Sequence, residues 1–152
     1  MREGPERVPA QNFLVLLTLG MKLLLVLGIT AILDLGAKET PLGLVTQMVV
    51  GAAVTAALVA LFLTLRNLPH RLPATVAALF GSDLILTGLF ALLLILLTKF
   101  AIDPALVGQL FSLWSTIVAG FIMHKAMDTI FLIGFGVGMF ILLVSLSVAA
   151  QT

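Results

Sequence analysis

Five long apolar segments dominate this sequence and limit what it can fold into. They run over Phe13 to Leu33, Leu44 to Leu65, Ala74 to Thr98, Ala105 to Met123 and Thr129 to Ala149. A helix needs about 20 mostly apolar residues to cross the roughly 30 Å hydrocarbon core of a bilayer. The segments are too long for the strands of a membrane β-barrel, and they lack the alternation of such strands. We therefore predict an all-α fold, a polytopic integral membrane helical bundle with five transmembrane helices.

The composition argues against a water-soluble domain. Hydrophobic residues make up 61% of the 152 residues and charged residues only 10%, whereas soluble domains carry about 25% charged residues. The net charge of +1 gives no reason to expect a nucleic-acid partner. We expect one transmembrane domain over residues 13–152 in contact with the lipid bilayer, preceded by a short cytoplasmic tail over residues 1–12.

The breaks between the segments carry signals for helix ends. Thr40-Pro41 and Asp103-Pro104 each place a capping side chain before a proline that suits the first helical turn. The third break is the charged loop from Arg66 to Arg71. The least marked break, from His124 to Asp128, requires a tight hairpin. Alternatively, segments four and five form one long bent helix, and the chain has four spans.

The distribution of lysine and arginine predicts the orientation of the chain in the membrane, because these residues are enriched in cytoplasmic loops. With the N-terminus inside, the inner face holds Arg2, Arg7, Arg66, Arg71 and Lys125. The outer face then holds only Lys38 and Lys99. We therefore predict a cytoplasmic N-terminus and an external C-terminus, with Arg66, Arg71 and Lys125 as the main topology determinants.

Small residues at a four-residue spacing predict where helices pack closely. Segment five contains Gly134 and Gly138, and segment four carries a stripe of Ser112, Thr116 and Gly120. Small side chains allow membrane helices to approach each other closely. We expect these residues to pack helices within one bundle; the alternative is a homodimer through Gly134 and Gly138. Trp114, near the middle of segment four, is expected to pack in the core.

The sequence contains no recognisable catalytic motif. It has no cysteine, and it lacks the HExxH, Walker and GxSxG patterns. His124 and Asp128 share one helical face, but two ligands without a third make a poor metal site. We therefore predict a non-enzymatic protein without a metal ion or other cofactor.

Two ionisable residues, Lys22 and Asp83, lie inside the predicted spans. Each lies nine residues after the start of its segment, and the two segments run in the same direction. At 1.5 Å per residue, both lie roughly 13 Å deep. Charges within the membrane are costly and often functional, so we predict an intramembrane ion pair, either structural or coupled to proton or ion movement. Alternatively, each charge separately finds water, Ser82, Thr18 or backbone carbonyl groups.

The order of features resembles the Yip family of Rab-interacting membrane proteins, in particular its small bacterial members. The resemblance covers about residues 44 to 149. It is carried by the charged hairpin from Leu65 to Arg71, by the stretch from Ala74 to Asp83, by Leu113-Trp114-Ser115 and by the short loop at His124. The second of these stretches is similar to the family's QTLTALFGT sequence. The resemblance implies five helices, no catalysis, a bacterial inner membrane location and a role in membrane organisation or trafficking.

Two functions are therefore predicted. The first is an interaction scaffold, which would bind another membrane protein or another copy of the chain. The second is a small transporter or channel subunit, which needs polar residues along a path. Within the segments, the polar residues available are Lys22, Asp83, Gln47, Gln109 and scattered serine and threonine residues.

Overall fold

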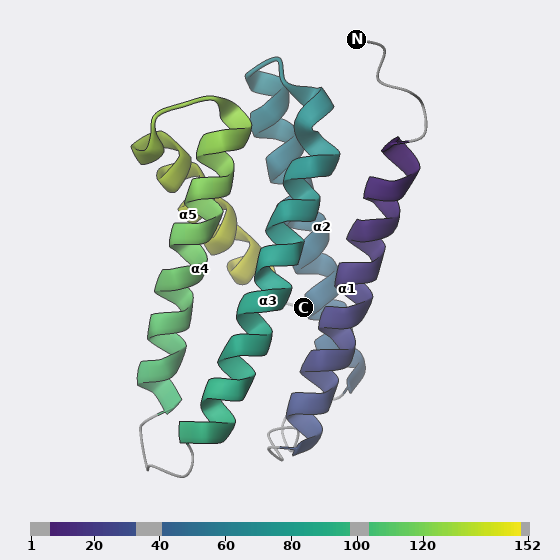
Figure 1. Ribbon diagram of the computed structural model, residues 1–152, viewed down its shortest axis with the longest axis vertical. Helices are drawn as coiled ribbons and strands as arrows, with labels where there is room; N and C mark the ends of the chain where they lie inside the picture. Colours follow the sequence, from purple (N-terminus) through teal and green to yellow (C-terminus); the bar gives the residue numbers. More distant parts are fainter. Residues whose placement is uncertain (1–6, 33–40, 98–103, 150–152) are drawn as a thin grey trace.

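The chain folds into a bundle of five α-helices (Figure 1). The computed structural model describes residues 7–32, 41–97 and 104–149. The elements are α1 (Arg7–Ile32), α2 (Pro41–Leu65), the 3-10 turn η2 (Pro69–Arg71), α3 (Leu72–Leu97), α4 (Pro104–Met127) and α5 (Phe131–Ala149). The predicted all-α class and five helices are confirmed, and the alternative that merges segments four and five into one helix is wrong.

Four of the helices are long and apolar enough to cross a membrane. The qualifying stretches are Val45–Leu65, Pro69–Leu96, Leu106–Met127 and Phe131–Val148. The apolar stretch described in α1, Phe13–Gly28, is shorter. Among the described residues, more large apolar side chains are exposed than buried. An exterior of this kind is typical of a surface that faces lipid, since soluble proteins rarely expose such large apolar patches.

The helices pack in a ring of four with α1 on the outside. Neighbours in the ring are α3 with α4, α4 with α5, α5 with α2 and, less extensively, α2 with α3. The first helix packs mainly along α3 and has little contact with α2. The start of α1, the α2–α3 turn and the α4–α5 turn lie at the same end of the bundle, which we call the turn end (Figure 1).

Both connections at the turn end stop a helix with a polar residue in the left-handed conformation. Asn67 has φ 58° and Asp128 has φ 53°, and asparagine and aspartate tolerate this region better than most residues. After α2, the backbone N–H of Asn67 donates to Thr64 O at 2.9 Å, and the backbone N–H of Leu68 donates to Leu63 O at 2.8 Å. These two bonds form a Schellman motif. After α4, Thr129 N donates to His124 O at 3.3 Å, the longer-range bond of the same motif.

Two other helix starts agree with the proline signals, whereas the start of α1 and the end of α4 differ from the predicted positions. Pro41 and Pro104 are the first residues of α2 and α4; their predicted caps, Thr40 and Asp103, lie outside the described residues. The first helix begins at Arg7, inside the range predicted as a tail. The fourth continues to Met127, so His124 and Lys125 lie in its last turn and not in a loop.

The α4–α5 pair is in close contact through three glycines. A Cβ atom added to Gly138 would lie 2.7 Å from Gly120 N, and one added to Gly134 would lie 2.5 Å from His124 Cα. A Cβ on Gly120 would lie 2.7 Å from Phe135 Cα. These glycines therefore pack one helix on another within the chain. Because α4 covers Gly134 and Gly138, their face of α5 is not open to a second copy.

Two predictions for α4 are wrong in part. Ser112 is exposed, so the predicted stripe does not pack along its whole length. Thr116 is half-buried and donates a 2.8 Å hydrogen bond to Ser112 O in its own helix, whereas Gly120 lies against Phe135 of α5. Trp114 is 57% exposed and lies outside the core. The inward face of α4 carries Ala119 and Met123 instead, which join the buried cluster with Val59 and Leu63 of α2.

Candidate functional site: a polar cavity between the helices

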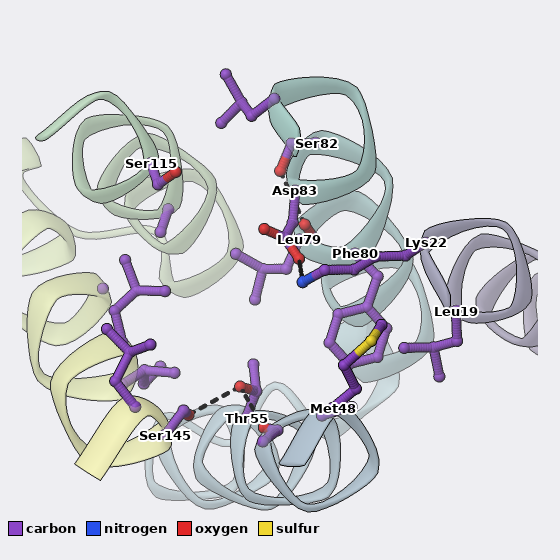
Figure 2. Close-up of a pocket in the computed structure, with 18 of the residues that line it drawn as sticks. Leu19, Lys22, Met48, Thr55, Leu79, Phe80, Ser82, Asp83, Ser115 and Ser145 are labelled. Carbon is purple, nitrogen blue, oxygen red and sulfur yellow. Dashed lines mark hydrogen bonds and ion pairs between the residues drawn. The ribbon is translucent and has the colours of Figure 1, made fainter. Parts of the chain in front are cut away.

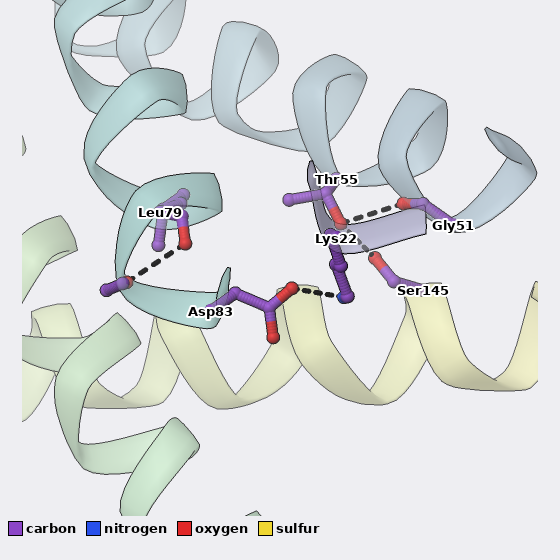
Figure 3. A network of polar contacts seen from close by, with 7 residues as sticks. Lys22, Gly51, Thr55, Leu79, Asp83 and Ser145 are labelled. Atoms are coloured by element: carbon purple, nitrogen blue, oxygen red, sulfur yellow. Dashed lines mark hydrogen bonds and ion pairs between the residues drawn. The ribbon is translucent and has the colours of Figure 1, made fainter. Parts of the chain in front are cut away.

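The structure brings Lys22 and Asp83 together in an ion pair. Lys22 extends from α1 and its Nζ donates a hydrogen bond to Oδ2 of Asp83 on α3 (Figure 3). The two side chains are 27% and 37% exposed. Their helices pack side by side, so residues at equal depth in parallel segments come within reach of each other.

The ion pair lines a cavity of about 310 Å³ between the five helices (Figure 2). All five helices contribute polar side chains to its wall. These are Thr18 and Lys22 from α1, Gln47 and Thr55 from α2, Ser82 and Asp83 from α3, Ser115 from α4 and Ser145 from α5. The rest of the wall is apolar or glycine. This convergence of polar residues from all five helices was not predicted from the sequence.

Most hydroxyl groups at the cavity already donate their proton in a hydrogen bond within the protein. Thr18 donates to Val15 O at 2.9 Å, Thr55 to Gly51 O at 2.8 Å and Ser82 to Leu79 O at 2.9 Å. The Oγ atoms of Thr55 and Ser145 lie 2.8 Å apart (Figure 3). Because a hydroxyl has one proton and that of Thr55 is already used, Ser145 donates to Thr55. These four oxygens keep lone pairs with which to accept hydrogen bonds.

The cavity wall offers a bound molecule fewer free hydrogen-bond donors than acceptors. Lysine has three N–H protons, and Lys22 uses one of them on Asp83. Ser115 Oγ is buried and has no hydrogen-bond partner among the described residues. The amide of Gln47 lines the cavity and supplies both donors and an acceptor. The second carboxylate oxygen of Asp83 adds a charged acceptor.

The residues predicted as topology determinants have a structural role at the turn end. Arg71 donates to Ala126 O at 3.1 Å and to Lys125 O at 3.4 Å, and it forms an ion pair with Asp128 at 3.5 Å. Arg66 donates to Met127 O at 3.4 Å. Both arginines thus bind the carbonyl groups at the C-terminus of α4, where cations are stabilising. Of the other basic residues used for orientation, Arg2, Lys38 and Lys99 lie outside the described residues.

We expect Arg71→Ala to lower the stability of the purified protein by about 1–2 kcal/mol, because it removes the cation from the end of α4. The measurement is thermal unfolding in mild detergent. His70→Ala is the matched control, since His70 is the exposed neighbour of Arg71 in the same turn. Equal melting temperatures for the two variants would show that Arg71 does not hold α4.

His124 and Asp128 lie in different surroundings. Asp128 is exposed and pairs with Arg71, whereas His124 Nδ1 is buried without a hydrogen-bond partner among the described residues. In the part of the chain that the structure describes, no three His, Cys, Asp or Glu side chains are grouped closely enough to hold a metal ion.

Comparisons with known proteins give no match. No family model, no curated protein and no solved structure matches the chain. The resemblance to the Yip family therefore remains a prediction that rests on the residues quoted for it.

Proposed function

We propose that this protein binds a small, mainly apolar molecule in its intramembrane cavity, a non-enzymatic role closer to that of a transporter subunit than to that of a scaffold. The observation that supports this is the convergence of polar groups from all five helices on one cavity, around the ion pair of Lys22 and Asp83. Apolar side chains would pack five membrane helices without the cost of burying charges. The volume of about 310 Å³ fits a small ligand, since binding pockets start at about 300 Å³.

The orientation that goes with this proposal places the turn end in the cytoplasm of a bacterial cell. Arg66, His70 and Lys125 are exposed at this end, and exposed basic residues are typical of the cytoplasmic face of inner membrane proteins. The N-terminus is then cytoplasmic and the C-terminus external.

A scaffold role in membrane organisation, as in the Yip family, is the second proposal. It is supported by the outer face of α4, where Trp114, Leu110, Leu113 and Phe121 are exposed. Tryptophan is enriched among the residues that dominate protein interfaces. The scaffold would bind another membrane protein at this face, since the glycines of α5 are already covered by α4.

Filling the cavity tests the first proposal. Ser115→Leu places a larger apolar side chain at the cavity wall without breaking a hydrogen bond of the described residues. The probes are hexanol, hexanoate, hexylamine and hexanamide, which share one apolar chain and differ in the polar group. At least one probe should raise the melting temperature of the wild type in lipid nanodiscs, and Ser115→Leu should abolish that rise.

Ser112→Leu is the matched control, because Ser112 lies on the same helix and is exposed outside the cavity. This variant should respond to the probes as the wild type does. A wild type that responds to none of the four probes would contradict the binding proposal, as would a Ser115→Leu variant with an unchanged response. A stoichiometric protein partner on co-purification, lost on Trp114→Ala, would instead favour the scaffold.

A further inference from the structure

We infer that the ligand is a neutral lipid alcohol, with its hydroxyl group at Lys22 and Asp83 and its apolar chain in a groove between α1 and α2. This inference rests on the proposed binding function and specifies the class of ligand. It follows from three properties of the site: an apolar groove that adjoins the cavity, the balanced charges of the ion pair and the excess of hydrogen-bond acceptors.

The groove exists because α1 packs along α3 and has little contact with α2. It has a volume of about 420 Å³. Its sides carry Val15, Gly20 and Leu23 from α1, and Val45, Val49 and Ala53 from α2. Gly20, Val49 and Ala53 are exposed, so the groove opens on the surface that faces lipid. A hydrocarbon chain can therefore enter it from the bilayer.

The groove and the polar cavity share a wall. Leu19, Met48, Ala52 and Phe80 line both spaces. Figure 2 shows the Lys22 side chain leaving α1 and extending into the cavity to reach Asp83. Met48 is an unbranched, flexible residue, a type that adapts readily to changes in packing. A ligand with an apolar chain and a polar end thus has a place for each part.

The ion pair favours a ligand without net charge. Lys22 and Asp83 balance each other. The attraction of a carboxylate to Lys22 is therefore offset by its repulsion from Asp83, and the attraction of an ammonium group to Asp83 is offset by its repulsion from Lys22. Either ion would also add an unbalanced charge near the middle of the bundle, where charges are costly. A neutral polar group avoids both costs and can still bind to the two charged partners.

The hydrogen-bond inventory favours a polar group that donates. Thr18, Thr55 and Ser82 have given their protons to backbone carbonyl groups, so they can only accept. Asp83 keeps a second carboxylate oxygen, also an acceptor. A hydroxyl group donates to one of these acceptors and accepts from Lys22. An ester or ether of the same shape can only accept, so it gives no proton to the second oxygen of Asp83 or to the three hydroxyl oxygens.

Photolabelling with a diazirine-bearing hexadecanol tests this inference on the full chain in nanodiscs. The label should be found on peptides of α1 and α2 that line the groove. Unlabelled hexadecanol should compete, whereas its methyl ether should compete about twofold to tenfold more weakly, which corresponds to one net hydrogen bond. Hexadecanoate and hexadecylamine should also compete more weakly than hexadecanol.

Gly20→Leu should abolish labelling of the groove, because the new side chain occupies it. No atom lies within 4 Å of a Cβ added to Gly20 or to Gly28. Gly28→Leu is therefore the control on the same helix, at an exposed position that lines neither space. Ala53→Leu blocks the groove from the α2 side and serves as a second variant if Gly20→Leu does not accumulate.

The outcomes separate this inference from the proposed function. Equal competition by hexadecanol and its methyl ether, or stronger competition by either charged analogue, would overturn the lipid alcohol and leave a binding function in place. Full labelling of α1 and α2 in both blocking variants would overturn the groove. If Ser115→Leu also leaves every probe response unchanged, the binding function itself is wrong.

Discussion

Gly138→Ala is expected to destabilise the bundle by about 1–3 kcal/mol, the usual cost of overpacking a well-packed interior. The added Cβ would lie 2.7 Å from Gly120 N and 2.9 Å from the carbonyl carbon of Ala119. Backbone atoms cannot rotate away as a side chain can, so α4 and α5 would have to separate. Gly134→Ala should behave in the same way, because its Cβ would lie 2.5 Å from backbone atoms of His124. Thermal unfolding in mild detergent measures both effects.

Gly136→Ala is the matched control from the same helix. No atom lies within 4 Å of a Cβ added there, and alanine is the better helix former by about 1 kcal/mol. Its melting temperature should therefore equal or exceed that of the wild type. If all three substitutions have the same effect, the close contact between α4 and α5 does not limit stability, and their intramolecular packing as described is wrong.

Much of this fold was predictable from the sequence, because a membrane imposes simple physical limits. The number of helices follows from the length of the apolar segments. The pairing of Lys22 with Asp83 follows from their equal depth, since an unpaired charge in an apolar medium has few alternatives. Pro41 and Pro104 mark helix starts, because N–H groups in the first turn have no partner within the helix and proline loses nothing by lacking one.

The sequence did not predict which side of each helix faces inward, and the features that depend on this were therefore missed. Apolar residues surround these helices almost evenly, so periodicity does not separate the face that packs from the face that meets lipid. The position of Trp114 near the middle of segment four predicts a core residue, but its side chain is exposed. The cavity was missed because its polar residues are far apart in sequence. The role of Arg66 and Arg71 depends on the position of the α4 end, which local sequence does not specify.

Lys22→Asp and Asp83→Lys, made singly, should each reduce accumulation in the membrane and lower the melting temperature. The first places two carboxylates next to each other between α1 and α3, and the second places two ammonium groups there. Leaving a charge unpaired costs about 1–3 kcal/mol. We expect the lower half of this range, because the side chains are 27% and 37% exposed and water in the cavity would screen them.

The double variant, Lys22→Asp with Asp83→Lys, should recover much of the loss, because it restores opposite charges at the same depth. In a double-mutant cycle, a direct contact gives a coupling energy of about 0.5–3 kcal/mol. A swapped variant that accumulates no better than the worse single variant would show that the pair does not stabilise α1 against α3.

Replacing both Lys22 and Asp83 with apolar residues separates the contribution of the pair to stability from its contribution to ligand binding. Lys22→Met with Asp83→Leu removes both charges and keeps comparable volume, and such replacements of buried ion pairs are often neutral or stabilising. We expect this variant to accumulate and melt like the wild type but to lose the preference for hexadecanol over its methyl ether in the labelling assay. Its apolar side chains cannot orient a hydroxyl group, although the groove that holds the chain is intact. A retained preference would show that the hydroxyl group binds elsewhere, and the pair would then only fasten α1 to α3.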